Sequence, residues 1–339
     1  MKPIKIFTFP ALRTFNRFVK YFNYKTDNSL PILELPEQVG NGNILSLDIF
    51  NDISINFLDG MIKRETILEF KNSSNFTILH FIYNYINPLF LKCGCDEPWK
   101  EVDQFQHAIV AQSFNENCQV KLKTNKLYCS YVISISKAAY LNNRNYCSQR
   151  IAGDLKTIFE EKGGNSDFFH NGSYNLEIAD VIKRIDISKL GSFEHFIFLE
   201  AQVHELINQH LIQFKKDVRN AGKLQSLSAY EVEAIHQATI FIENHLAEIK
   251  TVSQVARQVG LNNNKLQQGF NELFNLSVKK FIQSTRMKVA KDLLLNSEES
   301  ISQIVYIIGL NSTSYFSKLF KEHYEVSPST FRIKKFPKD

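Results

Sequence analysis

The sequence has few of the features that mark a secreted or membrane-embedded chain. It contains only five cysteines in 339 residues, and an odd count in a long chain argues against a secreted disulfide framework, so we expect reduced thiols in a cytoplasm. No window holds eighteen uninterrupted apolar residues, and Lys, Pro and Arg interrupt the first twenty. The sequence therefore predicts a soluble, cytoplasmic protein with no membrane partner.

Motifs of common enzymes are also absent. The chain holds no G-x-x-x-x-G-K-[ST] loop, no G-x-G-x-x-G turn and no G-x-S-x-G elbow. His204 and Glu205 begin an H-E-x-x-H pattern that Asn208 breaks. His210 follows six residues after His204, about 120° away around a helix, so we interpret this stretch as an ordinary helix surface. We predict no catalytic residue, no metal ligand, no cofactor and no enzymatic activity.

Some cysteines and histidines leave alternatives open. Cys93-Gly94-Cys95 has the spacing of a metal or redox pair, but no second Cys/His pair at zinc-like spacing lies nearby, so a structural role is favoured. A thiol-based sensor that uses Cys93 and Cys95 remains an alternative. His80 and His107 are expected to be satisfied strand or loop residues.

The N-terminal part of the sequence has the pattern of strands. Between residues 31 and 139 apolar residues recur with a period of two, as in Leu45, Leu47 and Ile49. Clusters of Asn, Asp, Gly and Ser, such as the turn-like Thr124-Asn125, separate these runs as in antiparallel hairpins. The pattern predicts a β-rich sandwich or barrel.

Helical spacing follows this region. It predicts a helix around Ile151 to Phe159 that stops at Gly163-Gly164, and a long helix over residues 193–218. The long helix has an apolar stripe made of Phe196, Leu199, Val203, Leu206, Ile207 and Leu211. This stripe is either a dimer surface or intradomain core, and the sequence favours neither.

A polar, Gly-containing stretch from Lys215 to Leu227, KKDVRNAGKLQSL, predicts a domain boundary. Ser228 and Glu231 then have the spacing of a capping box that starts a helix. The fold class predicted is α+β, with a β-rich sensing and dimerisation domain at residues 1–225 and an all-α domain at residues 228–339. Residues 251–339 hold thirteen Lys/Arg against seven Asp/Glu, the footprint expected of a nucleic-acid-binding module.

The C-terminal part contains an internal repeat. Nine positions match, first at an offset of 49 residues (Val252, Val255, Ala256, Val259, Gly260) and then at an offset of 50 (Leu266, Phe270, Ser277, Phe281). Each copy reads as a short helix, a glycine turn at Gly260 or Gly309, and a second helix. A connecting helix over Ser277 to Asn296 joins them and carries basic residues, some of which are expected to contact phosphates: Lys279, Lys280, Arg286, Lys288 and Lys291.

The second helix of each copy has an apolar face and a polar face. Leu266, Phe270 and Phe274 in the first copy, and Phe316, Leu319 and Phe320 in the second, are expected in the core. The outward faces carry amide and hydroxyl side chains that suit a DNA groove. The predicted DNA-binding residues are Asn263, Asn264, Gln267, Gln268, Thr313, Ser314, Ser317 and Lys318.

Residues 236–337 resemble the DNA-binding domain of the AraC/XylS family of bacterial transcription regulators. The resemblance rests on the paired copies, on Arg286 and Ala290 in the family's R-x-x-x-A spacing, and on the closing GLNSTSYFSKLFKEHYEVSPSTFR. This sequence departs from the family pattern at Val305, Leu310, Phe331 and Glu325, and the last removes an expected C-cap glycine.

The resemblance implies two helix-turn-helix units that bind promoter or operator DNA. It also implies a regulator, expected to be an activator, whose N-terminal domain senses a small-molecule effector and forms a homodimer, with RNA polymerase as a further candidate partner. The stretches RIAGDLKTIFEE and EAQVHELINQHL resemble regulators of siderophore uptake, which makes a siderophore one candidate effector. The ligand-binding residues stay unknown. The alternative is an enzyme with an appended DNA-binding module.

Overall fold

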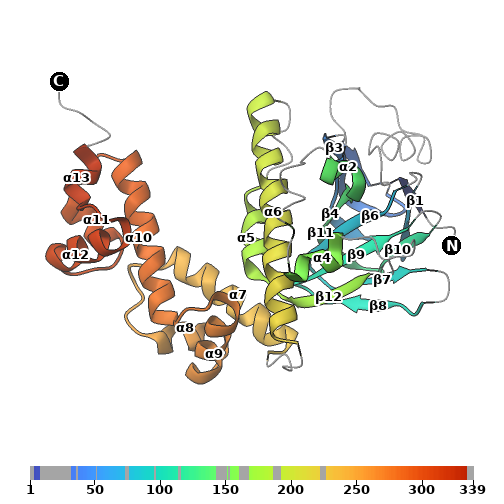
Figure 1. Cartoon of the computed structure of the whole chain (residues 1–339). Helices are drawn as coiled ribbons and strands as arrows, with labels where there is room; N and C mark the ends of the chain where they lie inside the picture. The colour runs from blue at the N-terminus through green and yellow to red at the C-terminus, as the bar shows by residue number, and fades with distance from the viewer. Residues whose placement is uncertain are drawn as a thin grey trace. The chain divides into compact units, whose positions relative to one another are not determined.

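The computed structural model describes residues 4–7, 32–35, 37–50, 52–72, 76–94, 97–113, 116–142, 151, 153–159, 168–185, 192–221 and 227–333. The chain divides into two compact units, Met1–Gln225 and Ser226–Asp339, here called the N-terminal and C-terminal units (Figure 1). Among the described residues, no helix has the length and apolar character that a membrane span requires.

Two β-sheets form the body of the N-terminal unit. The smaller sheet has the strand order β1 (Ile4–Phe7), β5 (Thr66–Lys71), β10 (Asn117–Leu122), β7 (Leu89–Cys93) and β8 (Lys100–Val102). The larger has the order β12 (Phe169–Tyr174), β9 (Gln106–Gln112), β6 (Ile78–Ile86), β11 (Lys126–Ser136), β4 (Ile53–Ile62), β3 (Gly40–Phe50) and β2 (Ile32–Glu34). Apolar side chains of both sheets share one core, including Phe70, Leu91 and Val132. The predicted β-rich fold is confirmed.

The turn at Thr124-Asn125 does not close a hairpin. Asn125 takes the left-handed conformation, with φ of 57°, as expected of a turn residue. The strands on either side, β10 and β11, belong to different sheets, so the hairpin interpretation is wrong here.

Helices accompany the larger sheet: α2 (Lys137–Asn142), α4 (Lys156–Phe159), α5 (Leu176–Lys183) and α6 (Phe193–Arg219), with a short 3₁₀ turn at Gly153–Leu155 (Figure 1). The long helix predicted over residues 193–218 is therefore confirmed. Its Leu199, Val203, Leu206 and Ile207 are buried within the unit, so these four residues form intradomain core. The predicted stop at Gly163-Gly164 lies outside the described residues.

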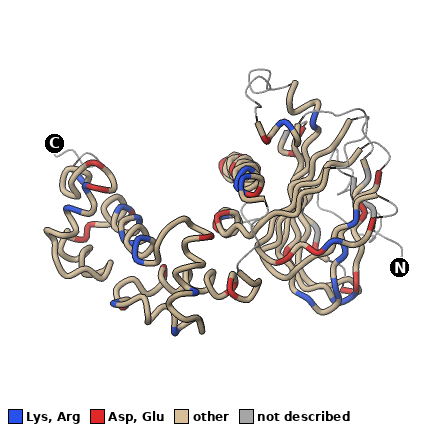
Figure 2. The backbone as a smooth tube through the Cα atoms, turned by 60° about the horizontal axis from the view of Figure 1, so that its bottom comes forward, with Lys and Arg blue, Asp and Glu red and all other residues tan. Residues whose placement is uncertain are grey.

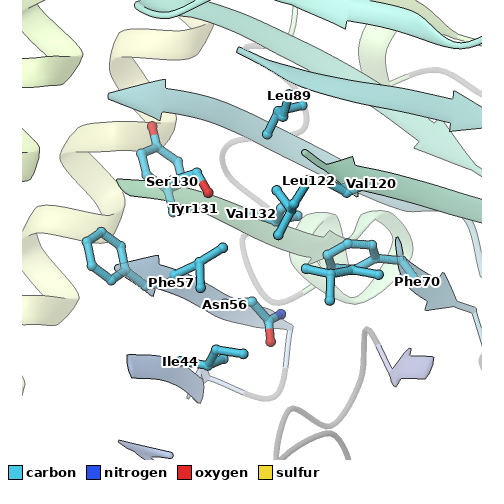
Figure 3. Close-up of a pocket in the computed structure, with 12 residues that line it drawn as sticks. Ile44, Asn56, Phe57, Phe70, Leu89, Val120, Leu122, Ser130, Tyr131 and Val132 are labelled. Carbon is cyan, nitrogen blue, oxygen red and sulfur yellow. The ribbon is translucent and has the colours of Figure 1, made fainter. Parts of the chain in front are cut away.

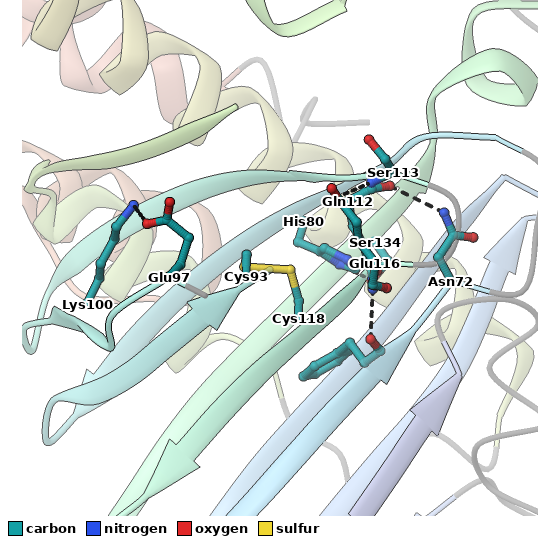
Figure 4. Close-up of a disulfide and its surroundings, with 11 residues drawn as sticks. Asn72, His80, Cys93, Glu97, Lys100, Gln112, Ser113, Glu116, Cys118 and Ser134 are labelled. Atoms are coloured by element: carbon teal, nitrogen blue, oxygen red, sulfur yellow. Dashed lines mark hydrogen bonds and ion pairs between the residues drawn. A yellow bond between two sulfur atoms is a disulfide. The ribbon is translucent and has the colours of Figure 1, made fainter. Parts of the chain in front are cut away.

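The expectation of reduced thiols is wrong for one pair of cysteines. Cys93 of β7 forms a disulfide with Cys118 of β10 (Figure 4). The two residues are direct partners in the antiparallel register, which brings their side chains together on one face. Cys95 lies outside the described residues. Cys129 is a free, buried thiol, and its burial raises its pKa to about 12.

His80 is a satisfied strand residue, as predicted. Its Nε2 lies 2.8 Å from Oε1 of Gln112 and its Nδ1 lies 3.0 Å from Oγ of Ser134 (Figure 4). Burial lowers the pKa of His80 to about 4, so the ring stays neutral near pH 7.

The described part of the C-terminal unit is helical. Its helices are α7 (Ala229–Asn244), α8 (Val252–Gln258), α9 (Asn263–Phe274), α10 (Val278–Asn296), α11 (Ile301–Ile307), α12 (Thr313–Tyr324) and α13 (Pro328–Ile333). The capping box predicted at Ser228 and Glu231 starts α7. The predicted all-α fold with two helix-turn-helix copies is confirmed. We call α8 with α9 the first repeat and α11 with α12 the second repeat.

Candidate nucleic-acid interface

The two repeats begin with the same local structure. A capping box starts each first helix, formed by Thr251 with Gln254 in α8 and by Ser300 with Gln303 in α11. The side chain and the backbone amide of each pair satisfy one another, so both helices start at a fixed residue.

Each first helix ends at a glycine in the left-handed conformation. The φ angles are 69° at Gly260 and 71° at Gly309, a region where a Cβ atom would cost about 1–2 kcal/mol. Side-chain caps then begin the second helices, because Asn262 Oδ1 accepts from the Lys265 amide and Ser312 Oγ accepts from the Tyr315 amide. The predicted helix, turn and helix are present in both repeats.

Aromatic and aliphatic side chains fix the inner face of each second helix. Leu266 and Phe270 in α9 are fully buried, and the Phe270 ring packs against Phe274 and Phe281. In α12, Phe316 and Phe320 are fully buried and Leu319 is nearly so. With this face held inward, the opposite face of each helix is directed to solvent.

Five of the eight predicted DNA-binding residues are exposed: Asn263, Asn264, Thr313, Ser314 and Lys318. The other three, Gln267, Gln268 and Ser317, are half-buried. In the first repeat, Asn263 donates from Nδ2 to Oγ of Ser253 on α8 at 2.9 Å. The repeat relationship places Asn264 of α9 and Ser314 of α12 at equivalent, exposed positions.

Gln267 is engaged in holding the C-terminal unit together. Its Oε1 accepts a 3.4 Å hydrogen bond from the amide of Val278, the first residue of α10. Its Nε2 donates to Oδ1 of Asn271 at 3.1 Å. The side chain thus helps to satisfy the orphan amides at the start of α10.

Tyr315 is an exposed residue that sequence reasoning did not select. Half of its surface is accessible, on the first turn of α12 beside Ser314. The equivalent position in the first repeat is Lys265, whose ammonium lies 3.0 Å from Glu231 of α7. The sequence signal that could have identified it is the offset of 50 residues between the repeats, which aligns the aromatic Tyr315 with the cationic Lys265.

The basic residues of α10 have different environments. Lys279, Lys280 and Lys288 are exposed, and Figure 2 shows Lys and Arg gathered along a helix of this unit. Lys291 lies over the Tyr324 ring, 5.5 Å from its centroid. The exposed lysines are suited to phosphate contacts, which position a protein on DNA without reading its sequence.

Arg286 is half-buried, unlike these exposed lysines. Its guanidinium donates to the carbonyls of Leu246 at 3.0 Å and Ile249 at 2.9 Å. Burial lowers the pKa of Arg286, although a guanidinium remains charged. The arginine therefore ties α10 to the segment that leads into α8.

The second repeat packs against the same segment. A Cβ atom at Gly309 would lie 2.5 Å from the carbonyl oxygen of Leu246 and 2.7 Å from Cα of Ala247. Residues 246–249 thus meet α10 through Arg286 and the second repeat through Gly309. These backbone contacts fix the orientation of the two repeats within the unit.

Residues 255–334 match a family model described as a helix-turn-helix domain. The Msm operon regulatory protein of Streptococcus mutans is 33% identical over 98 residues, which are 29% of this chain and 35% of the relative. The xylose operon regulatory protein of Escherichia coli K12 is 30% identical over 99 residues, or 29% and 25% of the two chains. Regulatory protein PocR of Salmonella typhimurium is 30% identical over 157 residues, or 46% and 50%.

These matches span half or less of each relative's own length. The family-model match runs from α8 through the second repeat, and the comparisons confirm the resemblance to the AraC/XylS family. The C-terminal unit carries a helix-turn-helix domain that is similar to those of AraC/XylS regulators.

Proposed function

We propose that this chain is a sequence-specific transcription regulator that binds promoter or operator DNA in the cytoplasm. The observation that carries the proposal is the pair of helix-turn-helix repeats held in one body by α10, Arg286 and Gly309. In such motifs the second helix enters the major groove, and successive groove segments on one side of DNA lie about 34 Å apart. We assign α9 to one of these two groove segments and α12 to the other.

The exposed residues at the start of each second helix are the proposed base readers. Asn264 has the side-chain amide that can bridge the edge of adenine, and Ser314 has a hydroxyl that bonds to either a donor or an acceptor. Lys318 reaches a base or a phosphate. The remaining assigned positions complete the two surfaces: Asn263, Gln267, Gln268, Thr313 and Ser317.

Binding-site selection with the full chain would identify the DNA sequence, and titration on that site would test the residues. Asn264→Ala should lower the affinity about tenfold and relax the preference at one or two base positions. Lys318→Ala should weaken binding and, if it contacts a phosphate, reduce the salt slope by about one. Lys126→Ala, an exposed lysine in the N-terminal unit, is the matched control. If both variants bind like this control, the assignment of α9 and α12 is wrong.

For the N-terminal unit we propose a response to a small-molecule effector, with activation of transcription through RNA polymerase as the output. The space between the two sheets measures about 30 Å³ and is lined by apolar side chains such as Phe57, Phe70 and Leu122, with Asn56 and Ser130 (Figure 3). This is room for about one water molecule. An effector would therefore displace these side chains or bind elsewhere on the unit.

A thermal-shift screen of the full chain against metabolites, with ferric siderophores included, would test the response. A ligand that binds the folded state alone raises the unfolding temperature in a concentration-dependent way. A reporter gene behind the selected DNA site would give the sign of regulation. No shift with any compound would contradict the effector, and lower expression would contradict the activator.

We also propose a homodimer through the first turns of α6. Phe193, Ile197 and Phe198 are exposed there, Phe193 by 76%, and such apolar side chains clustered on a surface mark interaction sites. Sedimentation equilibrium should show a dimer that dissociates in a Phe193→Ser, Ile197→Ser variant. A monomeric wild-type protein at micromolar concentration would contradict this part of the proposal.

A further inference from the structure

A buried polar cluster lies where β9, β12 and α6 of the N-terminal unit meet. His107 comes from β9, His170 from β12, and Asp217 from the last turns of α6. The His107 side chain is fully buried, Asp217 is 9% exposed and His170 is 19% exposed. The cluster is thus enclosed on the side of His107 and reaches solvent at His170.

The three side chains converge on one point. Asp217 Oδ2 lies 2.9 Å from His170 Nε2 and 3.0 Å from His107 Nε2, and the three atoms lie within 4.8 Å of one another. Ligand atoms around a tetrahedral zinc ion at 2.0–2.1 Å are about 3.3 Å apart. The two Asp217–histidine distances are a few tenths of an ångström shorter than this, so the carboxylate oxygen would have to move back by that amount to admit a metal ion.

We propose that His107 Nε2, His170 Nε2 and Asp217 Oδ2 bind a divalent first-row transition metal ion, with water from the His170 side as a further ligand. Two imidazoles and one carboxylate are a donor set that suits Zn²⁺, Fe²⁺ and Co²⁺, and an open position is common where only three protein ligands are present. The site lies in the N-terminal unit, outside the helices α9 and α12 to which DNA contacts are assigned.

The protonation states fit this use. Burial lowers the pKa of His107 and outweighs the raising effect of Asp217, so the imidazole is neutral near pH 7. Burial alone would raise the pKa of Asp217, but hydrogen bonds from His107, His170 and Ser173 outweigh it and hold the pKa well below its usual range. Neutral imidazole and ionised carboxylate are the forms that bind metals.

Other side chains orient the ligands. Ser173 Oγ and Gln213 Nε2 donate to the second oxygen of Asp217, Oδ1, at 2.6 Å and 2.9 Å. The Ser173 amide donates to Oδ2 at 3.2 Å, beside the two histidines. The Nδ1 atom of His107 lies 3.2 Å from Nδ1 of His210, and His210 Nε2 lies 2.8 Å from the Tyr131 hydroxyl. Ligating histidines usually have such a partner on their other nitrogen.

The number of protons along this chain of hydrogen bonds is the same with and without a metal. Without it, the Tyr131 hydroxyl donates to His210, His210 Nδ1 donates to His107, and His107 Nε2 donates to Asp217. With His107 Nε2 on the metal, the protons of His107 and His210 each move to the other ring nitrogen, and the direction of donation reverses up to Tyr131. Each residue keeps its one proton in both states.

The sequence around β12 makes room for the cluster. The register of β12 against β9 shifts between Asn171 and Tyr174, and Gly172 lies in this bulge. A Cβ atom at Gly172 would collide with the His107 ring and lie 2.7 Å from Asp217 Oδ2. Bulges often re-aim side chains at functional sites, and here the missing side chain admits the ring of His107.

Cobalt binding to the full chain tests the proposal. After treatment with a chelator, titration with Co²⁺ should produce a visible absorption band that saturates at one ion per chain, and Zn²⁺ should abolish it. His170→Gln, a conservative change at the exposed rim, should weaken binding by more than about 100-fold, and Tyr131→Phe, which acts through His210, by about 10- to 100-fold.

His195→Gln is the control, since His195 is an exposed histidine on α6 outside the cluster. It should bind Co²⁺ as wild type does. The proposal is overturned if wild type takes up no stoichiometric Co²⁺ or Zn²⁺, or if His170→Gln and His195→Gln bind equally. The cluster would then be a hydrogen-bonded link between α6 and the sheet. Circular dichroism of His170→Gln would confirm that the variant is folded.

Discussion

The two repeats share one layout but are supported differently. In the first repeat, α9 packs on α7, and Gly269 leaves space for the Ile235 side chain of that helix. In the second repeat the equivalent residue of α12 is Leu319. Its side chain packs in the core of that repeat and is 7% exposed. Duplicated sequences can therefore keep one external face while their inner faces adapt to different neighbours.

The turn glycines differ in the same way. Both Gly260 and Gly309 have positive φ angles. The nearest atom to a Cβ at Gly260 would be the Tyr230 hydroxyl at 3.4 Å, whereas a Cβ at Gly309 would meet the backbone of Leu246 and Ala247. The first glycine serves its turn alone, and the second also lies against the segment that leads into α8.

Paired alanine substitutions should separate these two roles and give the largest difference. Gly260→Ala should reduce the free energy of unfolding of the C-terminal unit by about 1–2 kcal/mol, the cost of the left-handed conformation. Gly309→Ala should cost about 3 kcal/mol or more, because overpacking against backbone adds to that cost. Urea unfolding of the two variants measures both. Equal losses would mean that the backbone contact at Gly309 contributes nothing.

Substitution of Arg286 should give the next largest effect, because it removes the contact between α10 and residues 246–249. Arg286→Lys keeps the charge but cannot donate to two carbonyls from one planar group. We expect a loss of about 1–2 kcal/mol in unfolding free energy, and weaker DNA binding with an unchanged salt slope. Lys288→Ala, an exposed change on the same helix, should preserve stability. If Arg286→Lys leaves both stability and affinity unchanged, the contact between α10 and residues 246–249 contributes nothing.

The helix C-caps should give the smallest difference. Asn275 ends α9 and Glu325 ends α12, both with left-handed φ angles, of 54° and 63°. Asn tolerates this conformation better than Glu. Glu325→Gly should therefore stabilise the unit by about 1 kcal/mol and Asn275→Gly by only a few tenths. Thermal unfolding decides between them. A destabilising Glu325→Gly would show that the Glu325 side chain makes a stabilising contact.

The repeat was the most predictable part of the molecule. Its helix starts, its glycine turns and the buried Phe270 and Phe320 follow from local patterns within about twenty residues, because helices depend on near neighbours. Position 325 holds Glu where a glycine is expected, yet the backbone there adopts the left-handed conformation that a C-cap glycine would take. Packing of Phe320 against Tyr324 and Phe331 accompanies that turn.

For the N-terminal unit, the sequence predicted the class of fold but not the pairing of its strands. Strand periodicity revealed a β-rich region, but it could not show that β10 and β11 belong to different sheets or that Cys93 meets Cys118. His210 was interpreted as helix surface and is fully buried against Tyr131 and His107, so that interpretation is wrong. The cluster unites residues from β9, β12 and α6, and no local pattern links such distant positions.

If the two repeats read DNA as one rigid body, the selected DNA site must have a fixed spacing between the two contacted segments. Inserting about five base pairs, half a helical turn, between the two contacted segments should reduce the affinity to that of one repeat, and about ten, a full turn, should not restore it. Recovery of full affinity at the ten-base-pair insertion would contradict rigid-body binding, because it requires repeats that move apart.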